Sequence, residues 1–202
     1  MKSNQYFIIH KPFNVLSQFT SKEEKNTLKD FFDLPKDVYP VGRLDYDSEG
    51  LLILTNDKEL NHHLLDPLFA HEREYWAQVE GEINQFAVHS LQSGAEISID
   101  GKPYRAKPCI AEEFFKEPHV AERDPPIRFR KNIPTSWARL ILTEGKNRQA
   151  RKMFAKVGFP VLRLIRYRIG KVTIDGLQPG EMRAMGKEEI YRLLAIDDKR
   201  KP

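Results

Sequence analysis

The spacing of apolar residues divides the chain into short predicted strands and helices. Residues 51–54 are all aliphatic and indicate a buried strand, whereas residues 72–80 alternate as a strand with one buried face does. Over residues 58–65 the leucines fall on one helical stripe, which predicts a core-facing helix. The same reasoning predicts strands at 6–9, 15–17, 137–142 and 161–169, and helices at 27–32, 84–92, 147–157 and 188–196.

The order of these elements favours an α+β fold. Strands and helices interleave irregularly, and the chain lacks both the regular alternation of a doubly wound sheet and a glycine-rich phosphate loop. The 202 residues, 40% of them hydrophobic, suffice for one domain or for two small lobes that share a core. Residues 117–134 are basic and proline-rich without a sustained period, so we expect a long loop there, and the basic end at 197–202 is expected to fray.

Composition excludes several classes of protein. No apolar run approaches the roughly 20 residues that span a bilayer, and the first residues lack the apolar stretch of a signal peptide. We therefore expect a cytoplasmic protein without membrane contact. Cys109 is the only cysteine, which excludes an intrachain disulfide and a cysteine-rich zinc site, and we interpret it as a small packed residue.

The distribution of charge is more informative than its total. The net charge is only +4, with a sequence pI near 9.0. Basic residues nevertheless gather at 123–131, 146–156 and 163–171, whereas acidic residues concentrate elsewhere. This pattern predicts a one-sided basic surface of the kind that binds a nucleic acid, the alternative being ordinary solvated charge on helices and loops.

The strongest candidate site is the loop that precedes the aliphatic run. It reads Gly-Arg-Leu-Asp-Tyr-Asp-Ser-Glu-Gly over residues 42–50 and is dense in charge. Gly42 allows a tight turn before Asp45, and Gly50 restarts the chain before the strand. A loop pinned at both ends can hold the Asp45 carboxylate rigidly.

A cation site or a hydrolase with two carboxylates is a different interpretation of the same loop. Asp45, Asp47 and Glu49 lack the ligand spacing of a calcium loop, and no cluster of histidines and acids completes a metal centre. His62 and His63 are adjacent in the predicted helix and so do not share a face. We therefore expect no metal ion, and interpret this histidine pair as surface residues.

The predicted helix at 147–157 has two different faces. At 100° per residue, Arg148, Lys152 and Lys156 fall on one side, with Arg151 at the boundary and Asn147 as the expected N-cap. The opposite side is apolar and comprises Ala150, Met153, Phe154 and Val157. A boundary arginine can bury its stem and still offer its guanidinium to a carboxylate.

Four segments together resemble the RsuA branch of the pseudouridine synthases. Besides the loop at 42–52, these are Glu-Arg-Glu-Tyr at 72–75, Glu-Gly-Lys-Asn-Arg-Gln-Ala-Arg-Lys-Met-Phe at 144–154 and Arg-Leu-Ile-Arg-Tyr-Arg-Ile-Gly at 163–170. Matches extend from residue 11 to residue 170. Tyr46 and Lys152 depart from arginines that are commoner in the branch, which weakens expected phosphate contacts more than chemistry. Most members carry an N-terminal S4 RNA-binding domain, for which the early first strand leaves no room.

The resemblance implies a fold and a set of roles. The fold is a mixed, largely antiparallel sheet dividing two α/β lobes around a cleft, formed by residues 1–202 as one catalytic domain. Asp45 becomes the catalytic aspartate, Arg151 its partner, and Tyr75 the ring that stacks on the target uracil. Leu164 supports the opposite wall of the substrate pocket, and Arg43 also lines it.

The implied reaction isomerises uridine in 23S ribosomal RNA to pseudouridine. It breaks the N1–C1′ bond and joins C1′ to C5 without any change of oxidation state, so no cofactor is expected. The aspartate either adds to C1′ or removes the 2′ proton, and a carboxylate suits such a carbon centre. Because the target base must leave its stack, flanking RNA must be held elsewhere. The candidate RNA-binding residues are Arg123, Arg128, Arg130, Lys131, Arg148, Lys152, Arg163 and Arg166.

Two other functions share these features. One is a non-catalytic RNA-binding or ribosome-assembly factor that retains the fold, although binding alone does not require Asp45, Tyr75 and Arg151. The other is a pseudouridine synthase with a different RNA target. The expected partner is ribosomal RNA, free or in an assembling large subunit, and the expected oligomeric state is a monomer.

Overall fold

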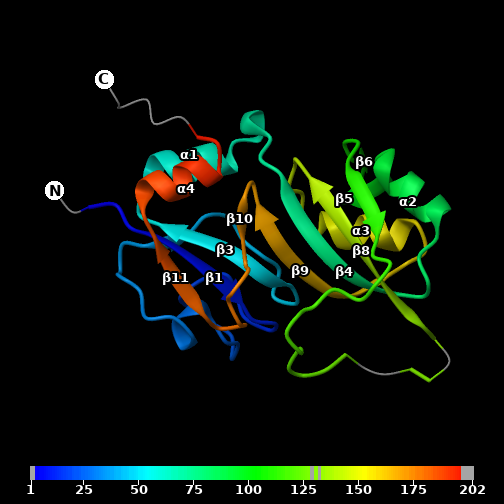
Figure 1. The fold of residues 1–202 in the computed structure, drawn as a ribbon, viewed down its shortest axis with the longest axis horizontal. Helices are drawn as coiled ribbons and strands as arrows, with labels where there is room; N and C mark the ends of the chain where they lie inside the picture. The colour runs from blue at the N-terminus through cyan, green and yellow to red at the C-terminus, as the bar shows by residue number, and fades with distance from the viewer. Residues whose placement is uncertain (1–2, 128–129, 132, 197–202) are drawn as a thin grey trace. The chain divides into compact units, whose positions relative to one another are not determined.

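The computed structural model describes residues 3–127, 130–131 and 133–196, and the chain divides into two compact units (Figure 1). The first comprises Met1–His71 and Tyr167–Pro202, and the second comprises Glu72–Arg166. Strand β9 (Val161–Ile169) passes from the second unit into the first. The α+β class predicted from the sequence is confirmed.

The first unit is built around a buried strand. β3 (Glu49–Thr55) has all seven residues buried and pairs antiparallel with β1 (Tyr6–Lys11), which in turn pairs antiparallel with β11 (Met182–Met185). β2 (Tyr39–Pro40) flanks β3, and β10 (Val172–Thr173) pairs with the end of β9. Because both faces of β3 are covered, its sequence is a continuous apolar run rather than an alternating one.

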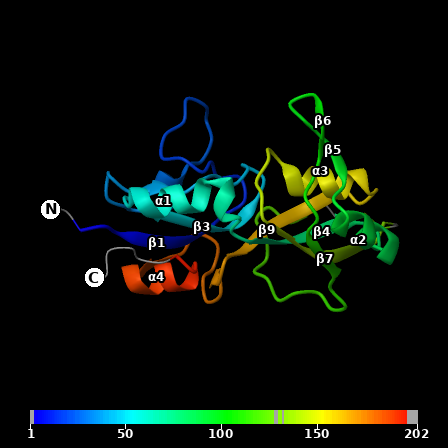
Figure 2. The ribbon, with the colours of Figure 1, turned by 90° about the horizontal axis from the view of Figure 1, so that it is seen from above.

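Among the described residues of the first unit, two α-helices and two 3-10 helices accompany the sheet. α1 (Lys58–Leu65) and α4 (Lys187–Leu193) lie at the end of the sheet where β3 ends, and Figure 2 shows β1 and β3 passing between them. The 3-10 helices are η1 (Leu28–Asp30) and η2 (Pro67–Phe69). One side of the unit's core is a cluster that joins β1, β3 and η1, namely Ile9, Val15, Leu28, Phe32, Val38, Leu52 and Leu54.

The second unit packs two helices and a hairpin against a sheet. Its strands follow the order β9, β4 (Arg73–Glu80), β8 (Thr135–Leu142), β7 (Ile110–Glu113), and β8 is antiparallel to both β4 and β7. A separate hairpin consists of β5 (Glu96–Ile99) and β6 (Lys102–Arg105). The core, which includes Ala77, Leu140 and Met153, joins this sheet to α2 (Gln85–Gln92) and α3 (Gln149–Lys156).

A buried carboxylate fixes both helices of the first unit. Asp57 caps α1 by accepting the Glu59 amide at 3.0 Å, and it accepts hydroxyl hydrogen bonds from Tyr6 at 2.6 Å and Tyr191 at 2.8 Å. Burial alone would raise the pKa of Asp57, but these hydrogen bonds to the charged form lower it below its usual 3.8. Burial, followed by the hydrogen bond to Asp57, raises the pKa of Tyr191. Asp57 therefore connects β1, α1 and α4.

Several predicted elements are wrong in detail. Residues 15–17 form a single bridge between Leu16 and Thr27 rather than a strand, and the helix expected at 27–32 is only the 3-10 turn η1. Helix α3 starts at Gln149, so Asn147 is not its N-cap; Arg148 holds that position with left-handed backbone (φ 54°). Leu65 is exposed although Leu60 and Leu64 are buried.

The Asp57 network leads to a stability prediction. Asp57→Asn keeps a side chain able to cap α1 but removes the negative charge from two tyrosine hydrogen bonds, so we expect a loss of about 1–3 kcal/mol at pH 7. Because the folded-state pKa lies below the unfolded one, the charge stabilises above pH 3.8, and this contribution disappears as the pH falls through the folded-state value. Urea unfolding from pH 7 down to pH 3 measures it. A difference between variant and wild type that is the same across this range would contradict the assignment.

Candidate active site

A buried serine holds the loop that carries Asp45. The Ser17 hydroxyl donates to the carbonyl of Leu44 at 2.8 Å and accepts the amide of Leu44 at 3.0 Å. Both residues are buried, so the peptide groups on either side of Leu44 have their hydrogen bonds satisfied away from water. The backbone immediately before Asp45 is fixed as a result.

The rest of the loop is held at both ends. Val41 donates its amide to Ile53 of β3 at 2.8 Å, and Asp45 closes a turn by accepting the Ser48 amide at 3.1 Å. Gly42 has left-handed backbone (φ 72°), and a Cβ there would lie only 3.2 Å from Cδ2 of Leu65. The prediction of a pinned loop is confirmed, and it leaves Asp45 half-buried.

The second unit brings Tyr75 and Leu164 into one cluster. Leu164 is buried in the core of that unit, and Tyr75 packs against the same core from β4. Arg73 lies two residues before Tyr75 in β4 and so shares its face of the strand. Burial lowers the pKa of Arg73 and the charge of Arg166 lowers it further, while Tyr75 opposes this shift. Arg73 is thus a largely desolvated guanidinium that interacts with Tyr75 and Arg166.

Glu144 organises the start of α3. Its carboxylate accepts hydrogen bonds from the Tyr104 hydroxyl, the Lys107 amide at 2.9 Å and the Gln149 side chain. Gln149 in turn accepts the Lys146 amide at 3.0 Å. Burial opposes ionisation of Glu144, but the hydrogen bonds prevail and lower its pKa, and the bond to Glu144 raises the pKa of Tyr104 to about 12. The network joins the β5–β6 hairpin to the helix that carries Arg151.

Helix α3 has the predicted apolar face. Met153 and Phe154 are fully buried, and Arg151 is half-buried. Arg151 donates from Nη1 to the Val161 carbonyl at 3.2 Å, which ties α3 to the start of β9. Arg151 and Tyr75 belong to the second unit and Asp45 to the first, and the pairing of Asp45 with Arg151 stays a prediction.

The basic residues divide into exposed and buried groups. Arg43, Arg130, Lys131 and Arg148 are exposed, and Arg123 and Lys152 are partly exposed. Arg163 and Arg166 are only 5% and 4% exposed, so including them in a basic surface was wrong. The guanidinium of Arg163 donates to the Ala121 carbonyl at 2.9 Å instead. Arg128 lies outside the described residues.

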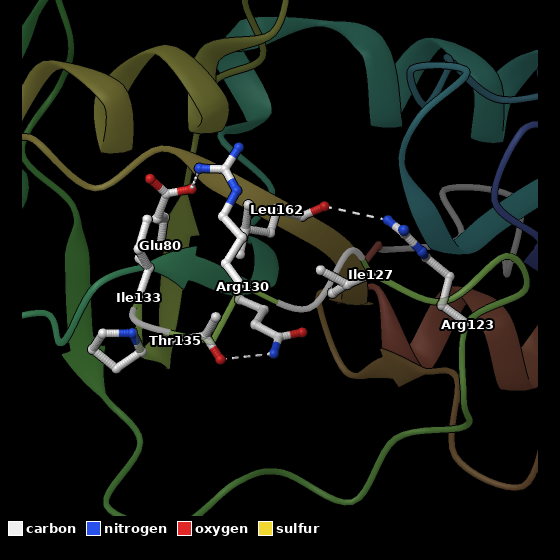
Figure 3. Close-up of a pocket in the computed structure, with 9 residues that line it drawn as sticks. Glu80, Arg123, Ile127, Arg130, Ile133, Thr135 and Leu162 are labelled. Carbon is white, nitrogen blue, oxygen red and sulfur yellow. Dashed lines mark hydrogen bonds and ion pairs between the residues drawn. The ribbon is translucent and has the colours of Figure 1, made fainter.

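The segment 117–134 has no helix or strand among its described residues and covers a pocket in the second unit. This loop pocket has a volume of about 370 Å³, and Figure 3 shows Arg130 reaching Glu80 and Arg123 reaching Leu162. Arg130 forms an ion pair with Glu80 at 2.8 Å, and Arg123 donates to the Leu162 carbonyl at 3.3 Å. The lining residues are Gln78, Glu80, Arg123, Ile127, Arg130, Ile133, Pro134, Thr135 and Leu162.

Two structural residues escaped the sequence analysis. Ser17 lies 27 positions from Leu44, and Glu144 reaches back 37 positions to Lys107. Because the bonded residues are far apart in the chain, no local sequence pattern indicates either hydrogen bond. Glu144 is, however, the first residue of the family motif at 144–154. Cys109 is partly buried and donates to the Leu91 carbonyl, and burial raises its pKa to about 11, as expected of a packed thiol. Within the described ranges, every helix is too short or too polar to cross a membrane.

Comparison with known proteins assigns the chain to a family. Residues 5–156 match the family described as RNA pseudouridylate synthase. A protein named ribosomal large subunit pseudouridine synthase E from Vibrio parahaemolyticus is 44% identical over 90% of this chain and 74% of its own. A protein of the same name from Xanthomonas axonopodis pv. citri is 45% identical over 85% of this chain and 89% of its own.

A solved structure gives the same answer for the fold. The crystal structure of a pseudouridylate synthase superposes with a TM-score of 0.76 at 26% identity, covering 96% of this chain and 75% of that one. The family match covers the segments that contain Asp45, Tyr75 and Arg151. The chain belongs to the RNA pseudouridine synthase family and is an rRNA pseudouridine synthase, an isomerase of uridine, with that family's fold.

Proposed function

We propose that the protein converts a uridine of 23S rRNA, in the large ribosomal subunit, to pseudouridine with Asp45 as the catalytic carboxylate. The observation that carries the proposal is the loop at 42–50, in which Ser17 and β3 fix an aspartate within the family motif. Two relatives that are 44% and 45% identical to this chain over the aligned residues are named for the large subunit.

The chemistry requires a fixed carboxylate beside the ribose. The N1–C1′ bond breaks, the base turns, C5 bonds to C1′, and the C5 proton is lost while N1 gains one. Asp45 acts at the ribose, either by adding to C1′ or by removing the 2′ proton. A carboxylate held by its backbone approaches that carbon without first being ordered.

The second unit supplies the surroundings of the base. Tyr75 stacks on the uracil and holds it while it is detached, and Leu164 supports the opposite wall. Arg151 orients the carboxylate with its planar guanidinium, which has further donors besides the Nη1 that bonds the Val161 carbonyl. One chain provides Asp45, Tyr75 and Arg151, so we propose that a monomer acts, in the cytoplasm where ribosomes are assembled.

Exposed basic residues hold the flanking RNA in this proposal. Arg43 lies two residues before Asp45, and Arg148 and Lys152 present charge from the start of α3. Arg130 and Lys131 extend from the loop pocket, where Arg130 exchanges Glu80 for a phosphate. Arg123 and Arg128 belong to the same segment.

The direct experiment maps pseudouridines in ribosomal RNA from cells with and without the gene. Loss of one large-subunit pseudouridine, restored by wild-type protein but not by Asp45→Asn, supports the proposal. Loss of a pseudouridine in another RNA would change the substrate only. An unchanged map together with a ribosome-assembly defect would favour the non-catalytic alternative.

Asp45→Asn should abolish isomerisation while leaving RNA affinity within a few fold. The substitution keeps the size of the side chain and removes only the reactive carboxylate, so we expect a loss of at least about a thousandfold in single-turnover rate. Tritium release from C5-labelled uridine measures the rate. Asp47→Asn on the same loop is the matched control, and turnover by the Asp45 variant would refute the assignment.

Ser17→Ala tests whether the buried hydroxyl positions Asp45. The alanine leaves the amide and carbonyl of buried Leu44 without this partner, so we expect a loss of about 1–3 kcal/mol in stability. The single-turnover rate at saturating RNA should fall by about ten- to a hundredfold with unchanged affinity.

The controls separate positioning from stability. Ser17→Thr retains a hydroxyl and should recover part of the rate, and Ser93→Ala removes a serine that bonds a helix carbonyl at an exposed site. If Ser17→Ala lowered stability but kept the full rate, the loop would not need this anchor.

Arg151→Lys should damage chemistry far more than Lys152→Ala. Lysine keeps the charge but loses the planar fork, so the single-turnover rate should drop at unchanged affinity. Lys152→Ala should instead weaken binding and reduce the slope of log affinity against log salt by about 0.7 to 0.9. The reverse pattern of rate and affinity would show that the roles on α3 are exchanged.

A further inference from the structure

Four rings gather where α1 passes into η2. Phe69 is the centre: its ring centroid lies 4.2 Å from that of His63, 5.9 Å from His62 and 6.3 Å from His71. Phe69 remains 43% exposed, and the side chain of His62 is 67% exposed. These four residues, termed the ring cluster, contact one another in edge-on and tilted arrangements, and Phe69 and His62 are its solvent-exposed rings.

The backbone under the ring cluster is rigid. The Asp66 carboxylate accepts the Leu68 amide at 2.9 Å, and the Asp66 carbonyl accepts the Phe69 amide at 3.2 Å. Ala70 ends the turn in left-handed conformation (φ 47°), with its amide bonded to Pro67. The rings are thus preorganised without being buried, which lowers the entropy lost when a ligand stacks on them.

The ring cluster adjoins the Asp45 loop. Leu65, the last residue of α1, lies so close to Gly42 that a Cβ on Gly42 would come within 3.2 Å of its Cδ2. Gly42 is three residues from Asp45, and Leu65 is four residues from Phe69. Leu65 therefore connects the loop that carries the proposed catalytic residue to the exposed rings.

We propose that the ring cluster is a stacking site for an unpaired RNA base next to the target uridine. The inference rests on the proposed function. A base that is flipped out for chemistry leaves its neighbour with one face unstacked. An aromatic face beside the active-site loop replaces the lost partner, and because every base has a π-face, the contact needs no particular sequence.

The composition of the ring cluster favours a nucleobase over a protein partner. Three of its four rings are imidazoles, whose nitrogens hydrogen-bond with water or with polar base edges while their faces stack. A protein-docking patch would instead bury a larger contiguous aliphatic surface. Leu68, the residue before Phe69, adds only one exposed aliphatic side chain to this segment, at 88% exposure.

The test uses an rRNA fragment that contains the mapped uridine, with 2-aminopurine placed in turn immediately before and after it. Stacking on a ring quenches 2-aminopurine fluorescence, so wild-type protein should quench one of the two probes. Phe69→Ala should abolish that quenching and weaken binding by about 5- to 150-fold, while the single-turnover rate at saturating RNA stays near wild type.

Matched variants make the result specific. Phe69→Trp keeps a ring and should retain affinity and quenching, whereas Phe69→Leu keeps apolar volume without a π-face and should behave like alanine. Phe86→Ala removes a phenylalanine that is 83% exposed on α2 and should change nothing. Thermal unfolding midpoints check folding, and His63→Leu provides a second variant of the ring cluster if Phe69→Ala is unstable.

The outcomes separate this inference from the proposed function. Wild-type protein that forms no pseudouridine in the fragment overturns the proposed function and the stacking site together. If the wild type is active but the Phe69→Ala and His63→Leu variants bind RNA and quench the probe as the wild type does, the stacking site alone is overturned. The exposed rings would then be interpreted as a contact surface for a protein.

Discussion

Strand β3 is fixed at both of its ends by hydrogen bonds from buried side chains, and the organisation of the first unit follows from this constraint. Before the strand, the Ser17 hydroxyl satisfies both polar groups of Leu44. After it, Thr55 donates to the Gln5 carbonyl at 2.6 Å and accepts the Asp57 amide at 3.0 Å, and Asp57 accepts the two tyrosine hydroxyls. A buried strand in the middle of a sheet cannot satisfy its flanking loops with water, so side chains must do so. The loop that carries Asp45 is rigid because it leads directly into such a strand.

The second unit uses the same solution at the start of α3. The carboxylate of Glu144 accepts hydrogen bonds from Tyr104 of the hairpin, from the Lys107 amide and from the Gln149 side chain of the helix. The Gln149 side chain also accepts the Lys146 amide. The helix begins after a left-handed residue, Arg148, at a position where the first amides need partners. The Gln149 amide finds its partner in the Lys146 carbonyl at 3.1 Å, and the Gln149 side chain accepts the Lys146 amide in return. In both units the motif residues expected to do chemistry sit next to a buried polar residue that fixes their backbone.

The sequence predicted the elements whose pattern is strong and local. α1 and β9 have the predicted bounds, and β3 and β4 are present as expected, because helical spacing and apolar runs report burial directly. The errors fall where contacts between distant residues determine the backbone conformation. Residues 15–17 form a single β-bridge instead of a strand, and Ser17 hydrogen-bonds to Leu44, which is 27 residues away. Asp45 was found by its glycine-flanked loop, but its supporting serine has no signature in spacing. The ring cluster was missed for a related reason, because the two histidines that do not share a helical face both reach Phe69 beyond the end of the helix.

Arginine is the residue whose role sequence predicts least well here. Arg163 and Arg123 lie in basic stretches, yet each donates to a backbone carbonyl of the other's segment: Arg163 to Ala121, and Arg123 to Leu162. The reciprocal pair attaches the long loop, which has few apolar side chains to bury, to the start of β9. A guanidinium has five donors and a long apolar stem, so it can hold an irregular backbone as readily as a phosphate. Charge density along the sequence therefore identifies where arginines gather, but burial decides which of them remain available to RNA.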